Sequence, residues 1–363
     1  MIARLLLNRE AASPSSPITE QSPSVLALES LLRRSLSARV LDIPELPTVA
    51  ATSSRRAKLA VLFSGGLDCT ALARISHDLV PVNEPIDLLN VAFQNPRVHK
   101  SKGEASYELC PDRLTGRAAF SELRRVCSGR DWRLVAIDVP YSEFQEHRQQ
   151  VITLMHPHNT EMDLSIACAL YFAARGVGHV HDDSQNCSQP YESSARVLLS
   201  GLGADELFAG YTRHATAFKR GGIAGLLDEL DLDVGRLGKR NLGRDDRAIS
   251  HWGREARFPF LDEDLVRWAL ALPVMEKCDF GVDPSCVDQS EDSCGSIEPG
   301  KKVLRCLAWK LGMKAVAREK KRAVRACLPN GPPLLTLCRY NSEPEQPRWR
   351  PARPRAQHYC HEN

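Results

Sequence analysis

Two short segments combine serine, glycine and an acidic residue in the way that phosphate binding requires. The first is Ser64-Gly65-Gly66-Leu67-Asp68, which follows the apolar run KLAVLF at 58–63. Glycines let the backbone approach an anion closely, and a helix that starts there points amide N–H groups at it. A carboxylate beside phosphates is repulsive unless a cation bridges them, so Asp68 implies Mg²⁺. The alternative is an ordinary helix start with an acidic residue in its first turn.

A second segment repeats this design. Ser200-Gly201-Leu202-Gly203-Ala204-Asp205 follows the apolar run RVLL at 196–199. If both runs are strands of one parallel sheet, both turns lie at its carboxyl edge and face each other across a crevice, where nucleotides bind in such folds. Asp68 and Asp205 then share one magnesium ion. The first turn is not a Walker A loop, because no Gly-Lys-Ser/Thr follows.

The elements that position these segments follow from hydrophobic periodicity. It predicts buried strands at 58–63, 88–93, 133–139 and 196–199, and helices at 25–41, 68–78, 118–126 and 162–175. Strands that alternate with helices indicate an α/β fold with a doubly wound parallel sheet. Residues 182–195 and 279–298 are polar and are predicted to be exposed loops. Only helical patterns occur after about residue 204, so we expect a helical half to follow the sheet.

Composition divides the chain into three parts. Residues 1–23 are predicted to be a flexible N-terminal segment, because 11–23 are rich in Ser and Pro. Residues 24–323 are expected to form the folded domain. Residues 324–363 are predicted to be a disordered basic tail, in which prolines and arginines leave little apolar surface to bury. Charge alone leaves an RNA- or partner-binding role of this tail open.

Composition also excludes several classes of protein. A formal net charge of +3 argues against a dedicated nucleic-acid binder. No run of 18 apolar residues occurs, so neither a membrane span nor a membrane partner is expected. The twelve cysteines contain no C-x-x-C pair, which removes zinc ribbons and indicates free thiols in a reducing compartment, the cytoplasm. Cys69 stands at a predicted helix N-terminus, a position that lowers thiol pKa values.

Four segments, in the same order, resemble the asparagine synthetase domain of the adenine-nucleotide α-hydrolase group. Residues 64–68 resemble its pyrophosphate loop, and residues 200–211 (SGLGADELFAGY) resemble its motif S-G-E-G-x-D-E-x-F-x-G-Y. Residues 255–262 (EARFPFLD) resemble E-x-R-x-P-F-L-D, and Lys301 with Leu304 and Arg305 resembles K-x-x-L-R. Residues 113–117 (RLTGR), 162–168 (MDLSIAC) and 241–247 (NLGRDDR) are similar to the subgroup called asparagine synthetase domain-containing proteins. The resemblance extends over residues 25–323.

The resemblance implies the adenine nucleotide α-hydrolase-like fold and roles for individual residues. The residues implied to bind ATP are Phe63 and Val91 around the adenine, Ser200 and Gly201 beside the nucleotide, and Ser64, Gly65, Gly66 and Asp68 around the pyrophosphate. Asp68 and Asp205 are implied to hold Mg²⁺. Asp205 and Lys301 are the implied catalytic residues, and the Lys301 ammonium offsets the charge that develops as pyrophosphate leaves.

The resemblance also implies that Glu255 and Arg257 hold the substrate. A structural salt bridge of Arg257 with Glu255 or Asp262 explains these residues equally well. The implied substrates are ATP, aspartate or a similar carboxylate, and ammonia. The implied activity is an ATP-dependent amidoligase of the asparagine synthetase type, in which the carboxylate is adenylated and then amidated.

Two positions depart from the family pattern. Leu202 replaces a Glu that the family needs to form the adenylate, so we expect a weakened reaction. The sequence opens Met1-Ile2-Ala3 and no cysteine precedes Cys69, so a glutaminase nucleophile of the family type is not expected and ammonia would need a separate donor. Two other functions stay open: a nucleotide-binding or interaction protein whose catalysis has lapsed, and a pyrophosphate-loop enzyme that acts on tRNA.

Overall fold

The computed structural model describes residues 6–10, 17–44, 56–95, 105–182, 187–282, 293–295 and 297–320. The predicted disordered tail, 324–363, lies outside these residues. The described parts of the segment 1–23, which was expected to be flexible, pack against the rest of the fold. Leu7 and Ile18 are buried, and the Asn8 amide donates to the Leu270 carbonyl at 2.7 Å. Burial of these two apolar side chains favours an ordered chain there, an effect that the Ser/Pro content of the segment does not reveal.

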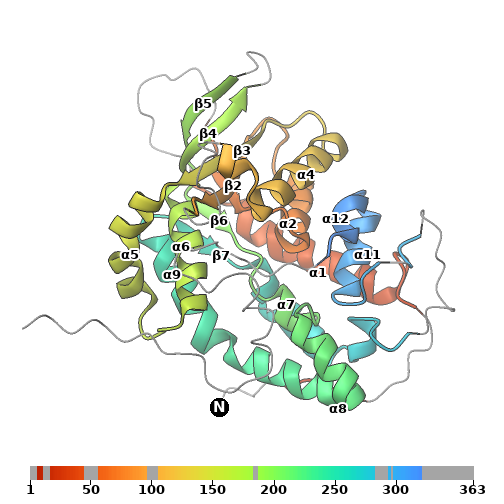
Figure 1. Cartoon of the computed structure of the whole chain (residues 1–363). Helices are drawn as coiled ribbons and strands as arrows, with labels where there is room; N and C mark the ends of the chain where they lie inside the picture. The colour runs from red at the N-terminus through yellow and green to blue at the C-terminus, as the bar shows by residue number, and fades with distance from the viewer. Residues whose placement is uncertain are drawn as a thin grey trace, which may run out of the picture.

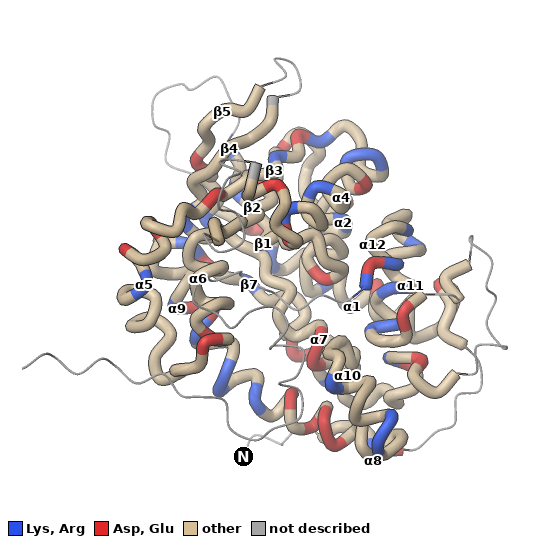
Figure 2. Tube along the Cα trace, viewed as in Figure 1, with Lys and Arg blue, Asp and Glu red and all other residues tan. Residues whose placement is uncertain are grey.

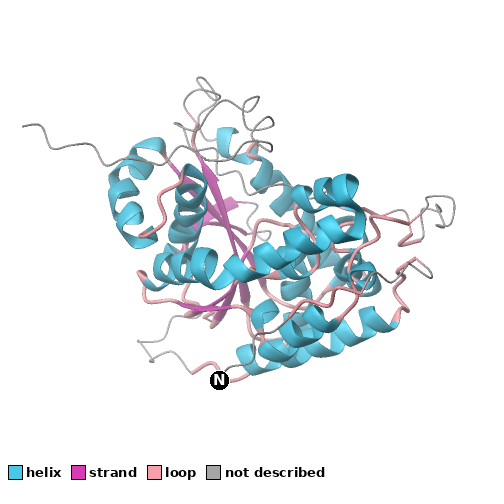
Figure 3. Cartoon of the chain, turned by 90° about the horizontal axis from the view of Figure 1, so that it is seen from below, coloured by secondary structure: helices cyan, strands magenta, loops and turns pink. Residues whose placement is uncertain are grey.

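A seven-stranded sheet forms the centre of the molecule (Figures 1 and 3). Its order is β5-β4-β3-β2-β1-β6-β7, and its strands are β1 (Leu59–Leu62), β2 (Ile86–Phe93), β3 (Trp132–Val139), β4 (Val177–Asp182), β5 (Cys187–Glu192), β6 (Val197–Leu199) and β7 (Glu255–Arg257). Strands β3, β2, β1, β6 and β7 are parallel, whereas β4 and β5 form an antiparallel hairpin beside β3. The four predicted strands correspond to β1, β2, β3 and β6, which confirms the α/β fold.

Each face of the sheet has its own core, because successive side chains of a strand point to opposite faces. Val61 and Phe63 belong to the first core, and Ala60 and Leu62 pack in the second. The helices that contribute side chains to the first core are α1 (Pro23–Val40), α2 (Leu67–Leu79), α4 (Pro111–Val126), α10 (Glu263–Ala271), α11 (Lys302–Lys310) and α12 (Lys314–Arg318). The second face is covered by α5 (Tyr141–Met155), α6 (Glu161–Arg175) and α9 (Gly243–Ser250). In Figure 3 the helices flank the strands on both sides, as a doubly wound sheet requires.

The chain reverses its direction across the sheet at β1. It passes from β1 to β2 and β3 through α2 and α4 on the first face. It then returns through α5 and α6 on the second face to β6, which pairs with the other edge of β1. The carboxyl ends of β1 and β6 therefore lie side by side at a topological switch point, where open α/β sheets bind their ligands.

The remaining helices lie mostly after β6. They are α3 (Ala105–Glu108), α7 (Ala204–Leu207), α8 (Thr212–Leu237), the π-helix η1 (Gly238–Leu242), and the 3₁₀ helices η2 (Pro259–Leu261) and η3 (Val274–Glu276). Helix α8 is bent at Gly221 and Gly222, whose backbone dihedrals are not helical. Its apolar residues Leu226, Leu227 and Leu230 form a third core with residues around η3. In the described ranges no helix has the length and apolar character needed to cross a membrane.

Several boundaries differ from the sequence-based expectations. Residues 182–195, predicted to be an exposed loop, contain β5, whose side chains are largely exposed on both faces and so show no apolar period. Strand β7 lies where only helices were expected, and its three residues are too few to show a period. Within 279–298, also predicted to be exposed, Cys294 and Ile297 are buried. Helix α4 begins at Pro111, well before the predicted start at 118, because proline suits the first turn of a helix.

Candidate active site

The turns after β1 and β6 are in direct contact. An added Cβ at Gly201 would lie 2.9 Å from the Asp68 Cβ, which no real side chain tolerates. Gly65 has a φ of +77°, a conformation that glycine adopts at little cost. The predicted meeting of the two Ser-Gly turns at the carboxyl edge of the sheet is thus observed, and the N-terminus of α2 opens into the same place.

Lys301 lies between the two aspartates. Its Nζ donates to both carboxylate oxygens of Asp68 at 2.7 Å and is 2.7 Å from Asp205 Oδ1. Gly210 makes room for this contact, since an added Cβ there would lie 2.0 Å from both Asp205 Oδ1 and Lys301 Cε. Three residues that are far apart in the sequence therefore form one charged cluster at the switch point.

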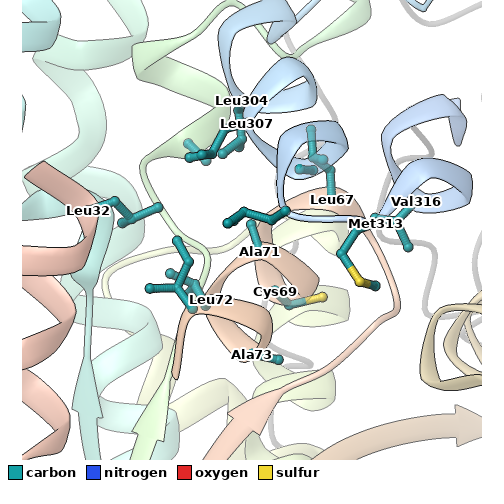
Figure 4. Close-up of a cluster of buried hydrophobic side chains, with 14 of the residues drawn as sticks. Leu32, Leu67, Cys69, Ala71, Leu72, Ala73, Leu304, Leu307, Met313 and Val316 are labelled. Carbon is teal, nitrogen blue, oxygen red and sulfur yellow. The ribbon is translucent and has the colours of Figure 1, made fainter. Parts of the chain in front are cut away.

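The position of Lys301 is set by the helix that follows it. Helix α11 packs on α2 through Leu304 and Leu307, which meet Leu72 and Leu67 in the core shown in Figure 4. Lys301 has a φ of +55°, unusual for a side-chain-bearing residue, so its backbone must be held by its surroundings. Its amide donates to the Phe208 carbonyl at 2.9 Å.

Arg305 secures the turn that carries Lys301. Its Nε donates to the Gly300 carbonyl at 2.9 Å, and its Nη1 donates to the Ala317 carbonyl at 2.6 Å. The buried guanidinium thus links the start of α11 to the end of α12. The K-x-x-L-R segment therefore supplies, in a little more than one helical turn, a cation, a buried leucine and an arginine that donates hydrogen bonds to backbone carbonyls.

The net charge of the cluster of Asp68, Asp205 and Lys301 favours binding of a further cation. Two carboxylates against one ammonium leave a net negative charge, and the side chains of Asp68 (19% exposed) and Asp205 (14%) are more open than that of Lys301 (4%). Among the described residues no group of three or more His, Cys, Asp and Glu side chains is arranged to hold a metal. Two carboxylates alone suit Mg²⁺ when phosphate oxygens complete its coordination. The donor set at Asp68 and Asp205 therefore fits a magnesium–nucleotide complex.

Glu206 follows Asp205 but points into the protein. Tyr211 donates its hydroxyl to Glu206 Oε1 at 2.7 Å, and the Asn241 amide donates to the same oxygen at 3.2 Å. Burial, aided by the nearby charge of Asp205, raises the pKa of Glu206. Asn241 belongs to η1, within the segment 241–247 that resembles the subgroup, and no role had been assigned to it from the sequence.

Leu202 brings no carboxylate to the turn after β6. Its amide donates to the Ser200 hydroxyl at 3.3 Å, so its backbone is part of the turn. Ser200 in turn donates its amide to the Arg257 carbonyl at 3.0 Å. These two hydrogen bonds stabilise the turn, and the Leu202 side chain takes part in neither.

The residues expected to frame an adenine do not lie together. Phe63 is buried in the first core, whereas Val91 is half-buried beside the second. Phe63 and Val91 thus lie on opposite faces of the sheet, because successive side chains of a strand point to opposite faces. Leu62 is half-buried on the same face as Val91, and the sequence reasoning assigned it no role.

Glu255 and Arg257 form a salt bridge rather than joining the cluster. Arg257 Nε donates to Glu255 Oε1 at 2.8 Å, and Arg257 Nη1 donates to the Arg39 carbonyl at 2.5 Å in α1. Of the two structural alternatives, the pair with Glu255 is the one observed, since Asp262 instead pairs with Arg39 at 2.9 Å. These contacts fasten β7 to α1.

Cys69 is a buried free thiol next to Asp68. Burial raises its pKa, and the adjacent Asp68 carboxylate adds to the effect. The lowering expected from its place at the start of α2 is therefore outweighed, because desolvation of a thiolate is the larger effect. A raised pKa leaves less of the nucleophilic thiolate at neutral pH.

Comparison with known proteins gives consistent similarities. The model of the family Asparagine synthase matches residues 186–230 and 224–338. Over 328 residues the chain is 39% identical to Asparagine synthetase domain-containing protein 1 of Gallus gallus, and the match covers 82% of this chain and 49% of that protein. The human protein of the same name is 37% identical over 331 residues, with 81% and 49% covered. Putative asparagine synthetase [glutamine-hydrolyzing] 1 of Methanocaldococcus jannaschii is 48% identical over 86 residues, with 24% and 16% covered.

Proposed function

Because this chain belongs to the asparagine synthase domain family, we propose that it is an ATP-dependent amidoligase of the asparagine synthetase type. The observation that carries the proposal is the contact of Lys301 with Asp68 and Asp205 at the carboxyl ends of β1 and β6. The chain spans about half the length of the curated relatives that it matches (49%). The proposal therefore concerns the reaction of this domain.

The nucleotide would lie across the two Ser-Gly turns. The backbone of Ser64, Gly65 and Gly66 would bind the pyrophosphate part of ATP, supported by the N-terminal end of α2. Ser200 and Gly201 would contact the nucleotide from the other turn. Leu62 and Val91, which share one face of the sheet, would border the adenine in place of the predicted pair with Phe63.

Asp68 and Asp205 would hold Mg²⁺ together with phosphate oxygens of ATP. When bound, the ion neutralises part of the phosphate charge. Lys301 would then contact the phosphates as a compact positive charge. Its ammonium would stabilise the negative charge that builds up on the leaving pyrophosphate.

The proposed reaction has two steps. A carboxylate oxygen of aspartate, or of a similar acid, attacks the α-phosphorus of ATP, and the bond to pyrophosphate breaks. Ammonia then attacks the acyl carbon of the mixed anhydride, AMP leaves and a proton is released. Ammonia would come from a separate donor. We propose a cytoplasmic location, which the free thiols at the described cysteine positions support.

Leu202 is expected to weaken this reaction. The family motif has a Glu at this position, and loss of a group that takes part in proton transfer costs about 10²- to 10⁴-fold in rate. Leu202→Glu should therefore raise the rate of asparagine formation with ammonium as nitrogen donor, measured by steady-state kinetics. Rapid turnover by the wild type, unchanged in Leu202→Glu, would show that the reaction does not need this carboxylate.

The same leucine favours a second candidate, a nucleotide-binding protein without catalysis. Release of pyrophosphate, screened over amino acids with ATP, Mg²⁺ and ammonium, separates the two. The amidoligase releases pyrophosphate with aspartate and ammonium, and the protein without catalysis releases none although it binds ATP. Release that requires added tRNA would favour a tRNA-modifying enzyme over both.

A further inference from the structure

A fully buried arginine lies behind the pyrophosphate loop, and the proposed reaction does not use it. Arg113, in the first turn of α4, is 0% exposed. Its Nε donates to Asn90 Oδ1 at 2.7 Å, its Nη2 to Asp138 Oδ1 at 2.7 Å, and its Nη1 to Glu108 Oε1 at 2.8 Å. A buried charge is tolerated only when its hydrogen-bonding groups have such partners, so Arg113 is held in one orientation.

The Asn90 side chain connects Arg113 to Phe63, the residue that follows strand β1. Because its Oδ1 accepts from Arg113, its Nδ2 points away from the guanidinium and donates to the Phe63 carbonyl at 2.9 Å. The same Nδ2 donates to the Asp112 carbonyl at 3.0 Å. Phe63 directly precedes Ser64, and Asp112 lies in the first turn of α4. One amide group therefore joins the start of the pyrophosphate loop to the start of α4.

The backbone of α4 also fills the space behind Gly65. An added Cβ at Gly65 would lie 2.5 Å from the carbonyl carbon and oxygen of Thr115 and 2.6 Å from the Gly116 Cα. An added Cβ at Gly116 would lie 2.5 Å from Asn90 Nδ2. The loop, the first turns of α4 and the Asn90 side chain are thus packed without spare volume, and a shift of one moves the others.

We propose that Asn90 and Arg113 are positioning residues that hold the loop 64–66 in the conformation that binds the pyrophosphate part of ATP. Backbone N–H groups bind an anion most tightly when they already point at it, since ordering a loop during binding costs free energy. Asn90 directs its side chain to the Phe63 carbonyl and to α4, on the first face of the sheet. Leu62 and Val91, proposed to border the adenine, lie on the second face. Asn90 and Arg113 therefore act on the pyrophosphate part and not on the adenosine part. The inference rests on the proposed ATP-binding function.

Calorimetric titration with Mg·pyrophosphate and, separately, with AMP tests the inference. Asn90→Leu keeps the branched shape of the side chain but is somewhat larger, and it removes the hydrogen bonds with Phe63, Asp112 and Arg113. We expect the Kd of pyrophosphate to rise about tenfold. The Kd of AMP should change by less than about twofold, because AMP does not need the β- and γ-phosphate contacts of the loop.

Gly116→Ala tests the same restraint without removing a polar group. The added methyl group displaces the Asn90 amide, whereas the higher helix propensity of alanine offsets part of the packing cost. A circular dichroism spectrum like that of the wild type verifies that the variant is folded. The expected result is again a selective loss of pyrophosphate affinity. Asp87→Asn is the matched control, because Asp87 is equally buried (0%) on the same strand but lies at the opposite end of β2. Both dissociation constants should stay unchanged in this variant.

The possible results separate the inference from the function on which it rests. Wild-type affinity for pyrophosphate in both Asn90→Leu and Gly116→Ala would overturn the positioning role. An equal loss of affinity for pyrophosphate and AMP would overturn it too, because that pattern reports a general loss of structure. If the wild type binds neither pyrophosphate nor ATP, the proposed function itself fails.

Discussion

Among single residues, Lys301 is the one on which the candidate site depends most. Its ammonium balances Asp68 and Asp205, which would otherwise repel each other. Its left-handed backbone costs about 1 kcal/mol or more for a residue with a side chain. That cost is offset by the core beneath α11 and by the contact of Arg305 with the preceding carbonyl. The strained backbone of Lys301 therefore carries the ammonium group that the proposed reaction uses.

Replacement of Lys301 by methionine should therefore affect stability as well as activity. In Lys301→Met two neighbouring carboxylates lose their counter-charge, and we expect the free energy of unfolding to fall by about 2 kcal/mol, less than for a fully buried pair because both aspartates reach solvent. Added Mg²⁺ should restore part of this loss, as measured by urea denaturation. Lys310→Met, which breaks an exposed pair with Glu29, is the control and should cost less than about 1 kcal/mol. Equal effects of the two changes, or no response to Mg²⁺, would contradict this role.

The sequence predicted the charged residues of the candidate site, but it did not predict the residues that hold the loop 64–66 in position. Asp68 and Asp205 were predicted to share one site because each lies in a recognisable turn motif, and the family resemblance implied that Lys301 reaches the phosphates there. Asn90 and Arg113 were not identified, since their roles depend on contacts between β2 and α4 that no local pattern encodes. An asparagine inside the otherwise apolar run LLNVAF was the available signal, because a buried amide must find hydrogen-bond partners.

Among the elements, the hairpin of β4 and β5 was the least predictable. The described side chains of both strands are exposed or half-buried, so neither face shows the apolar alternation that identifies a strand. Tertiary contacts fix it instead. The Ser193 hydroxyl donates to Asp87 Oδ2 at 2.6 Å, and the Tyr191 hydroxyl donates to the same oxygen at 3.0 Å. Asp87 thus connects the end of the hairpin to strand β2.

Burial of Asp87 makes the free energy of unfolding depend on pH. Burial raises the pKa of Asp87 to about 6, so the folded protein holds this proton more tightly than the unfolded chain does. Between about pH 4 and pH 6 the free energy of unfolding should fall as pH rises, by at most about 1.4 kcal/mol per pH unit for this group.

Urea denaturation of Asp87→Asn at several pH values tests this contribution. The variant should show a shallower decline of stability over this pH range. Burial also raises the pKa values of Asp245 and Asp279 to about 6, so part of the decline should remain. A decline as steep as that of the wild type would show that Asp87 ionises in the folded state as it does in the unfolded chain.

In the molecule as a whole, three helices from distant parts of the chain begin at the carboxyl edge of the sheet. The first turns of α2 and α7 and the residue before α11 each bring one charged side chain to this edge. Basic and acidic positions are interspersed along the helices in the view of Figure 2. We therefore propose a small-molecule substrate for the described part of the chain, rather than nucleic acid bound through one basic face.

The most direct test of the central claim is a calorimetric titration of ATP with and without Mg²⁺. The wild type should bind ATP tightly only when Mg²⁺ is present, and Asp68→Ala should lose this dependence on magnesium. Asp78→Ala is the matched control on the same helix, because Asp78 pairs with Arg74 and Arg33 away from the cluster, and it should bind like the wild type. Binding of Mg·ATP to Asp68→Ala with unchanged affinity would contradict the assignment of this cluster as the nucleotide site.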